Sequence, residues 1–388
     1  MHLPIVRPKF PELHYGPLSS RFAEQLEQCL ETGQVTNNGR HVQEFEAKLT
    51  DYLGAPTLAF NSGMSALTAM LLAADVRGGE VIVPSFTFPA TVQAVILAGA
   101  TPVFADIDQD TLTLDPESVE LFITDKTKAI LAVEPYGIPC DYEGFSEVCE
   151  DQDFWFLVDA APSLGTTYKG GHRMPGAHAQ ISSFHATKPF TTMEGGCLAS
   201  KSHEIIEKAA AIRNFGQREH GENLNFGING KMMEVCALIG LEQLKTWETT
   251  AALRKSHAAQ LRLKLDMDGI GLPFPDPRDS PIWTYCPILV DAPIRDEIRL
   301  ALYANHGIET RAYYQACHRL YPDPDFLPIT EETAKEVIAL PVYNDMTAEE
   351  IDYIATAVKD LVGEALCKVR TSSSSVVADI SESPSVAS

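Results

Sequence analysis

Short apolar runs alternate with stretches of helical length between residues 58 and 200. The runs are almost continuously apolar, which is typical of strands buried on both faces of a parallel sheet. Parallel neighbours need crossover connections, and the intervening stretches are long enough to supply them as helices. The pattern predicts strands at Val81–Pro84, Pro102–Ala105, Ala129–Val133 and Phe154–Asp159, and helices at Ser65–Ala74 and Ala90–Ala98. We therefore expect an α/β fold with a mainly parallel central sheet flanked by helices.

The pattern changes after about residue 245. A long helical stretch, roughly Val235–Asp268, is followed by a Pro-rich segment and by a strand predicted at Trp283–Val290. Thr347 and Glu350 have the spacing of a capping box, which predicts the start of a further helix. We predict a large α/β domain over residues 1–245 and a small C-terminal α+β domain over 246–369. Residues 370–388 are Ser-rich without periodic apolar positions, which predicts a disordered tail.

The composition and net charge of the chain exclude several classes of binding partner. The 388 residues carry a formal net charge of −23, which repels nucleic acid and anionic membranes. No window resembles a signal peptide or a membrane span, so we expect a cytoplasmic protein. The eight cysteines form no CxxC pair and no Cys/His spacing typical of zinc, so we expect no metal. A phosphorylated ligand would need local compensation from backbone N–H groups and a few placed cations.

The segment that carries most chemical information is Ser183-Phe-His-Ala-Thr-Lys188. Lys188 lies between two phenylalanines in an apolar, hydroxyl-rich stretch, and Pro189 follows it directly. Burial lowers the pKa of a lysine because it disfavours the charged ammonium. A neutral amine is what Schiff-base chemistry with a carbonyl requires. The alternative is a lysine with a purely structural role.

Asp159 ends the predicted strand FWFLVD. A buried carboxylate is costly unless it has a partner, and ligands of open α/β sheets bind at the carboxyl ends of the strands. Such a carboxylate can hold a pyridinium nitrogen protonated and so make the ring an electron sink. The alternative is that Asp159 caps a following helix.

Two further turns follow predicted strands. Asn61-Ser-Gly-Met-Ser-Ala66 connects a strand to a helix, where Gly63 permits close approach and the helix N-terminus offers N–H groups to a phosphate. Ser85-Phe-Thr-Phe88 follows the strand that ends at Pro84. Phe88 could stack on a planar ring, although an aromatic residue after a strand more often belongs to the core.

In this order and spacing the chain resembles the DegT/DnrJ/StrS group of sugar aminotransferases, which are fold type I enzymes dependent on pyridoxal phosphate. The resemblance extends from about Asn37 to about Leu366. It rests on the motifs NSGMSAL, VIVPSFTFPAT, GATPVFADID, DAAPSLG, SFHATKPFTTMEGG, RNFG, GINGKMMEVCALIGLEQL, HGIETRAYY and LPVYNDMTAEEI. The specific part is SFHATK followed by EGG, with the DAA motif upstream.

The resemblance implies roles for individual residues. Lys188 matches the lysine that binds the cofactor as a Schiff base and later moves the substrate proton. Asp159 matches the acid paired with the pyridinium nitrogen, and Phe88 matches the aromatic ring stacked on the cofactor. Three residues match the cradle of the cofactor phosphate, namely Gly63, Met64 and Ser183. Asn229 matches an asparagine that reaches the cofactor phosphate of the partner subunit, which implies a homodimer with shared active sites.

Two positions depart from the family pattern. Pro162 stands where a Gln or His normally follows DAA, and proline has neither a side-chain donor nor a backbone N–H. Lys231 stands where Arg is usual, and the two are not interchangeable where a bidentate grip is needed. Cofactor tuning and the sugar position that reacts are therefore left open.

The implied reaction is transamination of a nucleotide-linked keto-deoxysugar, with glutamate as amino donor and pyridoxamine phosphate as the intermediate cofactor form. Two alternatives stay open. One is the dehydratase branch of the family, in which His typically replaces the lysine, so Lys188 argues against it. The other is a catalytically silent relative that binds a ligand or regulates. The sugar, the nucleotide and the aminated carbon are not specified by these motifs.

Overall fold

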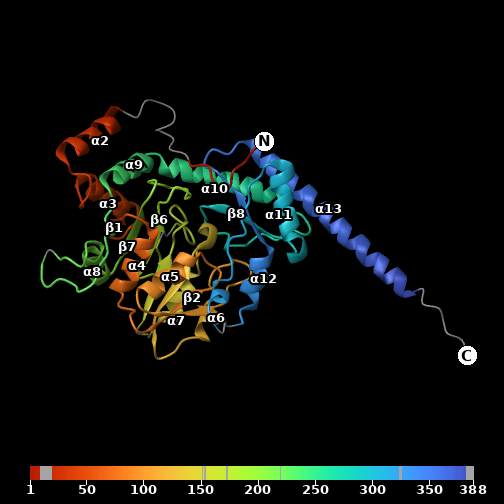
Figure 1. The fold of residues 1–388 in the computed structure, drawn as a ribbon, viewed down its shortest axis with the longest axis horizontal. Helices are drawn as coiled ribbons and strands as arrows, with labels where there is room; N and C mark the ends of the chain where they lie inside the picture. The colour runs from red at the N-terminus through yellow and green to blue at the C-terminus, as the bar shows by residue number, and fades with distance from the viewer. Residues whose placement is uncertain are drawn as a thin grey trace, which may run out of the picture.

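The computed structural model describes residues 1–8, 20–150, 152, 154–171, 174–218, 220–322 and 326–381 (Figure 1). Its strands are β1 (Thr57–Phe60), β2 (Glu80–Pro84), β3 (Thr101–Ala105), β4 (Thr127–Val133), β5 (Trp155–Asp159), β6 (Ala179–Ser183), β7 (Gly196–Ser200), β8 (Tyr285–Leu289) and β9 (Val337–Pro341). Its helices are α2 (Ser20–Thr32), α3 (Arg40–Leu53), α4 (Gly63–Ala73), α5 (Pro89–Leu97), α6 (Pro116–Glu120), α7 (Tyr142–Cys149), α8 (His203–Arg213), α9 (Glu234–Leu244), α10 (Trp247–Lys264), α11 (Ala292–His306), α12 (Pro328–Glu336) and α13 (Ala348–Ser381), with 3-10 turns η1 (Pro135–Gly137) and η2 (Cys317–Leu320).

The first seven strands form one sheet in the order β1-β7-β6-β5-β4-β2-β3. The pairings β2–β3, β2–β4, β4–β5 and β5–β6 are parallel, whereas β7 is antiparallel to both β6 and β1. All strands except β7 therefore point the same way, and their carboxyl ends meet at one edge. The mainly parallel sheet predicted from the apolar runs is confirmed.

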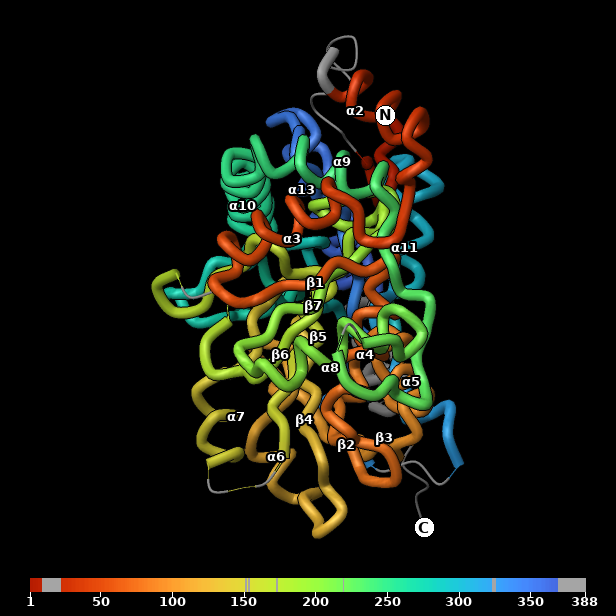
Figure 2. The backbone as a smooth tube through the Cα atoms, turned by 90° about the vertical axis from the view of Figure 1, so that its left-hand side faces the viewer, coloured from red at the N-terminus to blue at the C-terminus, as the bar shows by residue number. Residues whose placement is uncertain are grey.

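Both faces of this sheet are covered, which explains why its strands are apolar without alternation. Val81, Val83 and Leu131 pack with α4, α5 and α8 on one face. Their neighbours Ile82 and Ile130 pack toward α6 and α7 on the other. Figure 2 shows α4 and α5 on one side of the strands and α6 and α7 on the opposite side. Successive residues of a strand thus serve two different cores.

The predicted elements agree with the structure, with shifts of one or two residues at most of their ends. The long stretch predicted over Val235–Asp268 is two helices, α9 and α10, separated at Lys245 and Thr246. The capping box is confirmed, since Thr347 Oγ1 accepts from the Glu350 N–H at 3.1 Å and Glu350 Oε2 accepts from the Thr347 N–H at 2.9 Å. The domain division at residues 245 and 246 stays a prediction.

The C-terminal part pairs β8 with β9 in an antiparallel ribbon beside the carboxyl edge of the large sheet. Asp106, just after β3, accepts from the N–H groups of Ile329 and Thr330 at 3.0 and 2.8 Å and so caps the start of α12. Phe86 and Tyr136 belong to the same core as the ribbon. These contacts hold the C-terminal residues against the loops that follow β2, β3 and β4.

The last helix differs from the sequence expectation. A disordered tail was expected from residue 370, but α13 continues through Ser381 and extends away from the body (Figure 1). A helix makes its backbone hydrogen bonds locally, so it can propagate past its packed segment once it has nucleated. Residues 382–388 of the expected tail lie outside the described residues. No helix in the described part of the chain is long and apolar enough to cross a membrane.

Candidate active site

A cavity of about 390 Å³ opens at the carboxyl edge of the large sheet. Residues that follow β1, β2, β5 and β6 line it, because the carboxyl ends of these strands converge there. The cavity brings together six of the seven predicted site residues, namely Gly63, Met64, Phe88, Asp159, Ser183 and Lys188.

Lys188 lies in the turn after β6, where its N–H donates to the carbonyl of His185 at 2.9 Å. Its side chain is partly exposed to the cavity. Burial lowers the pKa of the Lys188 amine, although the charge of Asp159 opposes this shift. The structure thus places an amine with increased neutral character at the cavity wall, as a nucleophile requires.

Asp159 ends β5 and is buried. Its Oδ2 accepts from Thr91 Oγ1 at 2.7 Å, and its Oδ1 accepts from the Ala161 N–H at 3.2 Å. Burial raises the pKa of Asp159, while these two hydrogen bonds and the charge of Lys188 lower it. The alternative role as a helix cap is wrong, because the described residues that follow β5 form turns rather than a helix.

Phe88 is the N-cap residue of α5 and is 55% exposed at the cavity wall. A core phenylalanine would be buried, so the more common core role is excluded here. An exposed ring beside a buried carboxylate suits a planar, partly apolar ligand.

The N-terminus of α4 lies on the other side of the cavity. A Cβ built on Gly63 would lie 2.7 Å from the Ser183 Cβ, so only glycine fits this close approach. The Ser62 side chain accepts from the Ser65 N–H, which caps one of the first-turn donors. The N–H groups of Gly63 and Met64 have no intrahelical acceptor and are available to an anion.

A tyrosine wall, formed by Tyr285, Tyr313 and Tyr314, closes the cavity from the C-terminal part. The rings of Tyr313 and Tyr314 stack with centroids 5.6 Å apart. Burial raises the pKa of Tyr314 well above its ordinary value, so its hydroxyl stays neutral. None of the three tyrosines was predicted from the sequence; the paired tyrosines that end HGIETRAYY are the signal that points to two of them.

Other polar residues of the cavity were not predicted from the sequence, among them Thr91, His185 and Glu194. His185 Nδ1 lies 2.9 Å from Thr187 Oγ1, and its Nε2 lies 3.4 Å from Glu194 Oε1. Glu194 is part of the EGG motif, and Thr91 occurs four residues after Thr87 in SFTFPAT. Neither spacing indicates chemistry by itself.

Asn229 is the one predicted site residue that does not line this cavity. It is exposed, and its carbonyl accepts from Asn61 Nδ2 at 2.9 Å. Its neighbour Gly230 accepts from the Asn61 N–H at 2.8 Å. Lys231 Nζ donates to Asn214 Oδ1 at 3.0 Å and lies 4.4 Å from the ring centroid of Phe215. The segment 229–231 is thus tied to the turn that precedes α4.

Pro162 is buried and lines the cavity. Its carbonyl accepts from Thr284 Oγ1 at 2.9 Å, which joins the DAAP turn to the C-terminal part. The cavity also contains the hydroxyl groups of Thr87, Ser183 and Thr187. A Gln or His side chain at position 162 would have been a hydrogen-bond partner for such groups.

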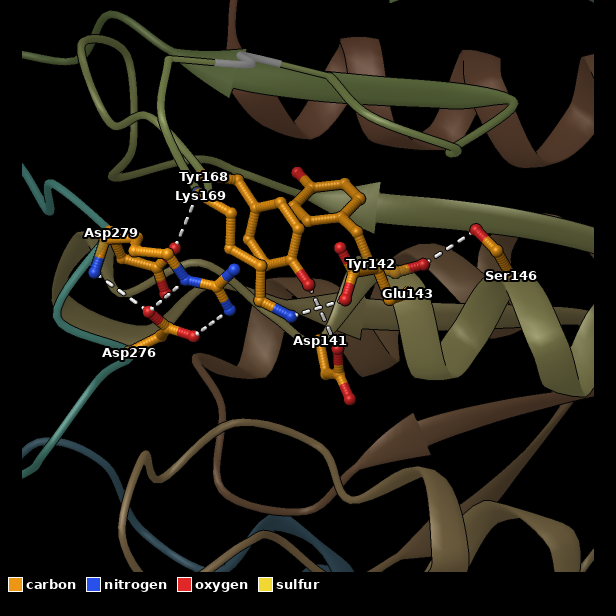
Figure 3. A network of polar contacts seen from close by, with 9 residues as sticks. Asp141, Tyr142, Glu143, Ser146, Tyr168, Lys169, Asp276 and Asp279 are labelled. Atoms are coloured by element: carbon orange, nitrogen blue, oxygen red, sulfur yellow. Dashed lines mark hydrogen bonds and ion pairs between the residues drawn. The ribbon is translucent and has the colours of Figure 1, made fainter.

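A larger cavity of about 510 Å³ lies near α7 and has different chemistry. Its polar network includes the ion pair of Lys169 Nζ with Glu143 Oε2 at 2.6 Å and the bond from Tyr168 to Asp141 at 3.1 Å (Figure 3). Most of its charged residues are acidic: Asp108, Asp115, Glu117, Glu120, Asp141, Glu147, Asp276 and Asp279. This surface repels phosphorylated ligands.

The structure also brings together Cys29, His41 and Glu234, which sequence spacing did not suggest. Glu234 Oε2 accepts from the His41 N–H at 2.9 Å and thereby caps α3. Arg40 Nε donates to His41 Nε2 at 3.2 Å. The positive guanidinium beside the imidazole would repel a bound cation. We therefore assign the contact between Glu234 and His41 to helix capping and not to a metal site.

Comparisons with known proteins agree with this geometry. The sequence model of the DegT/DnrJ/EryC1/StrS aminotransferase family matches residues 18–359. A dTDP-4-amino-4,6-dideoxy-D-glucose transaminase of Shigella dysenteriae is 35% identical over 375 residues, which cover 92% of this chain and 98% of the relative.

Solved structures that share this fold include those of DesI and Spr1654. The structure of DesI in the presence of its TDP-sugar product is 31% identical, with a TM-score of 0.83 over 91% of this chain and 93% of that one. The structure of Spr1654 from Streptococcus pneumoniae, in its PLP form, is 27% identical, with a TM-score of 0.83 over 94% of this chain and 99% of that one. Spr1654 is also known in a PMP form.

Proposed function

The chain belongs to the DegT/DnrJ/EryC1/StrS aminotransferase family and is a pyridoxal-phosphate-dependent sugar aminotransferase, and we propose that it transfers the amino group of glutamate to a ketone on a nucleotide-linked deoxyhexose. The observation that carries this proposal is the shared cavity of Lys188 and Asp159, with Phe88 exposed in its wall. The names of two relatives, a dTDP-dideoxyglucose transaminase and an enzyme with a TDP-sugar product, support a nucleotide-linked deoxy sugar.

The residues of the cavity fit pyridoxal phosphate. The close approach of Gly63 to Ser183 brings the first turn of α4 against the end of β6, and all three residues Gly63, Met64 and Ser183 line the cavity. We therefore assign the phosphate to the free N–H groups of this first turn. Phe88 supplies an exposed ring face, and Asp159 supplies a carboxylate for the ring nitrogen. When bound, the cofactor supplies an electron sink and carries the amino group between the two substrates.

Lys188 then has two tasks. Its Nζ would hold the cofactor covalently, because a partly buried amine of lowered pKa is a nucleophile. Its Nζ also takes and returns the proton at the substrate carbon that loses or gains the amino group. Asp159 keeps the proton on the ring nitrogen by its negative charge. The tyrosine wall shields the cavity from water on the side where the C-terminal part of the chain lies.

The direct test is to react the purified protein, loaded with pyridoxal phosphate, with single amino acids and then with nucleotide-linked keto sugars. We expect glutamate to convert the cofactor to pyridoxamine phosphate, and a dTDP-linked 4-keto-6-deoxyhexose to convert it back. Mass spectrometry of the product then locates the new amino group. A protein that binds no cofactor, or that reacts with no amino acid, would contradict the proposal.

We also propose that the active enzyme is a homodimer in which Asn229 reaches the cofactor phosphate of the other subunit. Among the described residues that line the cavity, Lys188 is the only Lys or Arg. A cofactor phosphate and a nucleotide diphosphate both need positive partners or N–H donors, and the chain has a net charge of −23. Asn229 is exposed beside the turn that precedes α4, where a second subunit could approach.

Asn229→Asp is expected to weaken cofactor binding roughly ten- to a hundredfold, because a carboxylate would replace a donor to the phosphate. Asn229→Ala removes the donor without adding charge and should have a smaller effect. Cofactor retained after gel filtration measures both. Sedimentation of a fully active monomer at assay concentration would overturn the shared site.

Pro162→Gln is expected to change the rate with the native sugar only modestly. One neutral hydrogen bond is worth about 0.5–1.5 kcal/mol, or roughly a factor of two to ten. We infer that an ordered water or one of the cavity hydroxyls takes the place of the missing side chain. Pro162→Ala is the control for loss of the ring alone. A gain of several orders of magnitude in the glutamine variant would identify the native site as impaired.

A further inference from the structure

Thr87, in the connection between β2 and α5, and Thr91, in the first turn of α5, form a chain of hydroxyls behind Asp159. Thr91 Oγ1 donates to Asp159 Oδ2 at 2.7 Å, and Thr87 Oγ1 lies 2.8 Å from Thr91 Oγ1. Both threonines are 1% exposed, so water does not compete with these bonds. The first turn of α5 thus contains Thr91, which donates to Asp159. Three residues earlier, the N-cap residue Phe88 lies at the cavity wall.

The direction of this chain follows from the hydrogens available. An ionised carboxylate only accepts, and a threonine hydroxyl has one hydrogen to donate. Thr91 gives its hydrogen to Asp159, so Thr87 must donate to the Thr91 oxygen. Each bond then polarises the next, which strengthens the donor that contacts the carboxylate.

The carboxylate needs such donors because it is buried. Burial favours its neutral form, whereas the Thr91 hydroxyl, the Ala161 N–H and the charge of Lys188 favour the ionised form. Tyr314 also interacts with Asp159, and burial keeps its hydroxyl neutral. The positive end of the α5 dipole acts in the same direction as the Thr91 hydroxyl.

The outer end of the chain is held by the C-terminal part of the protein. The Thr87 carbonyl accepts from Cys317 Sγ at 3.3 Å. The Ser85 carbonyl accepts from the Cys317 N–H at 3.0 Å, and Ser85 Oγ accepts from the His318 N–H at 3.0 Å. The turn that carries Thr87 is therefore clamped between β2 and η2, which limits the positions open to its hydroxyl.

We propose that Thr91, oriented by Thr87, is a positioning residue that keeps Asp159 ionised and thereby keeps the proton on the cofactor's ring nitrogen. This inference rests on the proposed function. A buried acid–base pair can exist as carboxylate with protonated nitrogen or as carboxylic acid with free nitrogen. The low-polarity surroundings favour the neutral pair, and the Thr91 donor favours the charged one.

The test uses the full-length holoenzyme loaded with pyridoxal phosphate that is ¹⁵N-labelled at the ring nitrogen. In wild type, the ¹⁵N shift should be that of a protonated ring. In Thr91→Val, which keeps the shape and removes the donor, the shift should move toward a free pyridine nitrogen. The rate of glutamate deamination should fall roughly ten- to a hundredfold with little change in KM, as expected for one bond to a charged group.

Two further variants separate this role from simple packing. Thr91→Ser restores a hydroxyl and should recover the wild-type ¹⁵N shift and most of the rate. Thr87→Val leaves the Thr91 bond in place and should give an intermediate shift, so it tests the chain even if the first variant does not fold. Wild-type shifts and rates in both valine variants would overturn the inference while leaving the proposed function intact. A wild type that binds no labelled cofactor would instead overturn the proposed function.

Discussion

Lys188→Ala is expected to abolish turnover while the protein stays folded. Lys188 has two tasks in the proposed reaction, covalent retention of the cofactor and proton transfer at the substrate carbon. Proton transfer by a placed side chain contributes about 10²–10⁴-fold on its own, so losing both tasks should reduce the rate by more than about 10⁴-fold. The visible absorbance band of the lysine-linked cofactor should disappear as well.

The thermal stability of Lys188→Ala should not fall together with its activity. Burial lowers the pKa of the Lys188 amine, so the folded protein disfavours the charged form that the unfolded chain adopts at neutral pH. Removing the amine therefore removes an unfavourable group. We expect a melting temperature for Lys188→Ala that equals or exceeds that of the wild type without added cofactor.

Two controls define what the lysine supplies. Lys188→Arg keeps a cation but cannot lose its proton, so it should be as inactive as the alanine variant. Lys208→Ala removes a surface lysine whose Nζ lies 2.7 Å from Glu204 Oε1, and it should keep full activity. Wild-type rates in either Lys188 variant would show that another group performs the covalent step.

Asp159→Asn is expected to bind the cofactor and lose most of its activity. The amide has nearly the shape of the carboxylate, but it lacks the negative charge that holds a proton on the ring nitrogen. Removing one such electrostatic partner typically costs about 10²–10³-fold in rate. The decisive measurement is the single-turnover rate of glutamate deamination, and an unchanged rate would leave Asp159 with a structural role only.

The pH dependence of stability gives an independent readout for Asp159. Burial raises its pKa in the folded state, so its favourable contribution is fully present below the unfolded pKa and is lost as the pH rises through the folded pKa. The asparagine variant does not titrate at this position. Its advantage in melting temperature over the wild type should therefore grow from acidic to neutral pH, and a constant difference would contradict the assigned direction.

The sequence by itself determined the class of fold and most of the candidate site. Continuous apolar runs separated by helical stretches are compatible with few arrangements other than a parallel sheet covered on both faces. Parallel strands place their carboxyl ends at one edge, so residues that follow different strands are brought together even though they are far apart in the chain. The family resemblance assigned Gly63, Phe88, Asp159 and Lys188 to one site, and this geometry explains why they line one cavity.

Only the tertiary structure decided which partners these residues have. Thr91 contacts Asp159, and the tyrosine wall reaches the cavity, because α5 and the C-terminal part pack against the same sheet edge. The segment after Asp159 looked suited to a helix that this residue could cap, yet it forms turns anchored through Pro162 to Thr284. An aromatic residue after a strand more often belongs to the core, yet Phe88 is exposed at the cavity wall. Local periodicity indicates which face of a helix or strand is buried. Contacts between elements depend instead on packing among residues that are far apart in the chain. A single sequence carries no direct signal for those contacts.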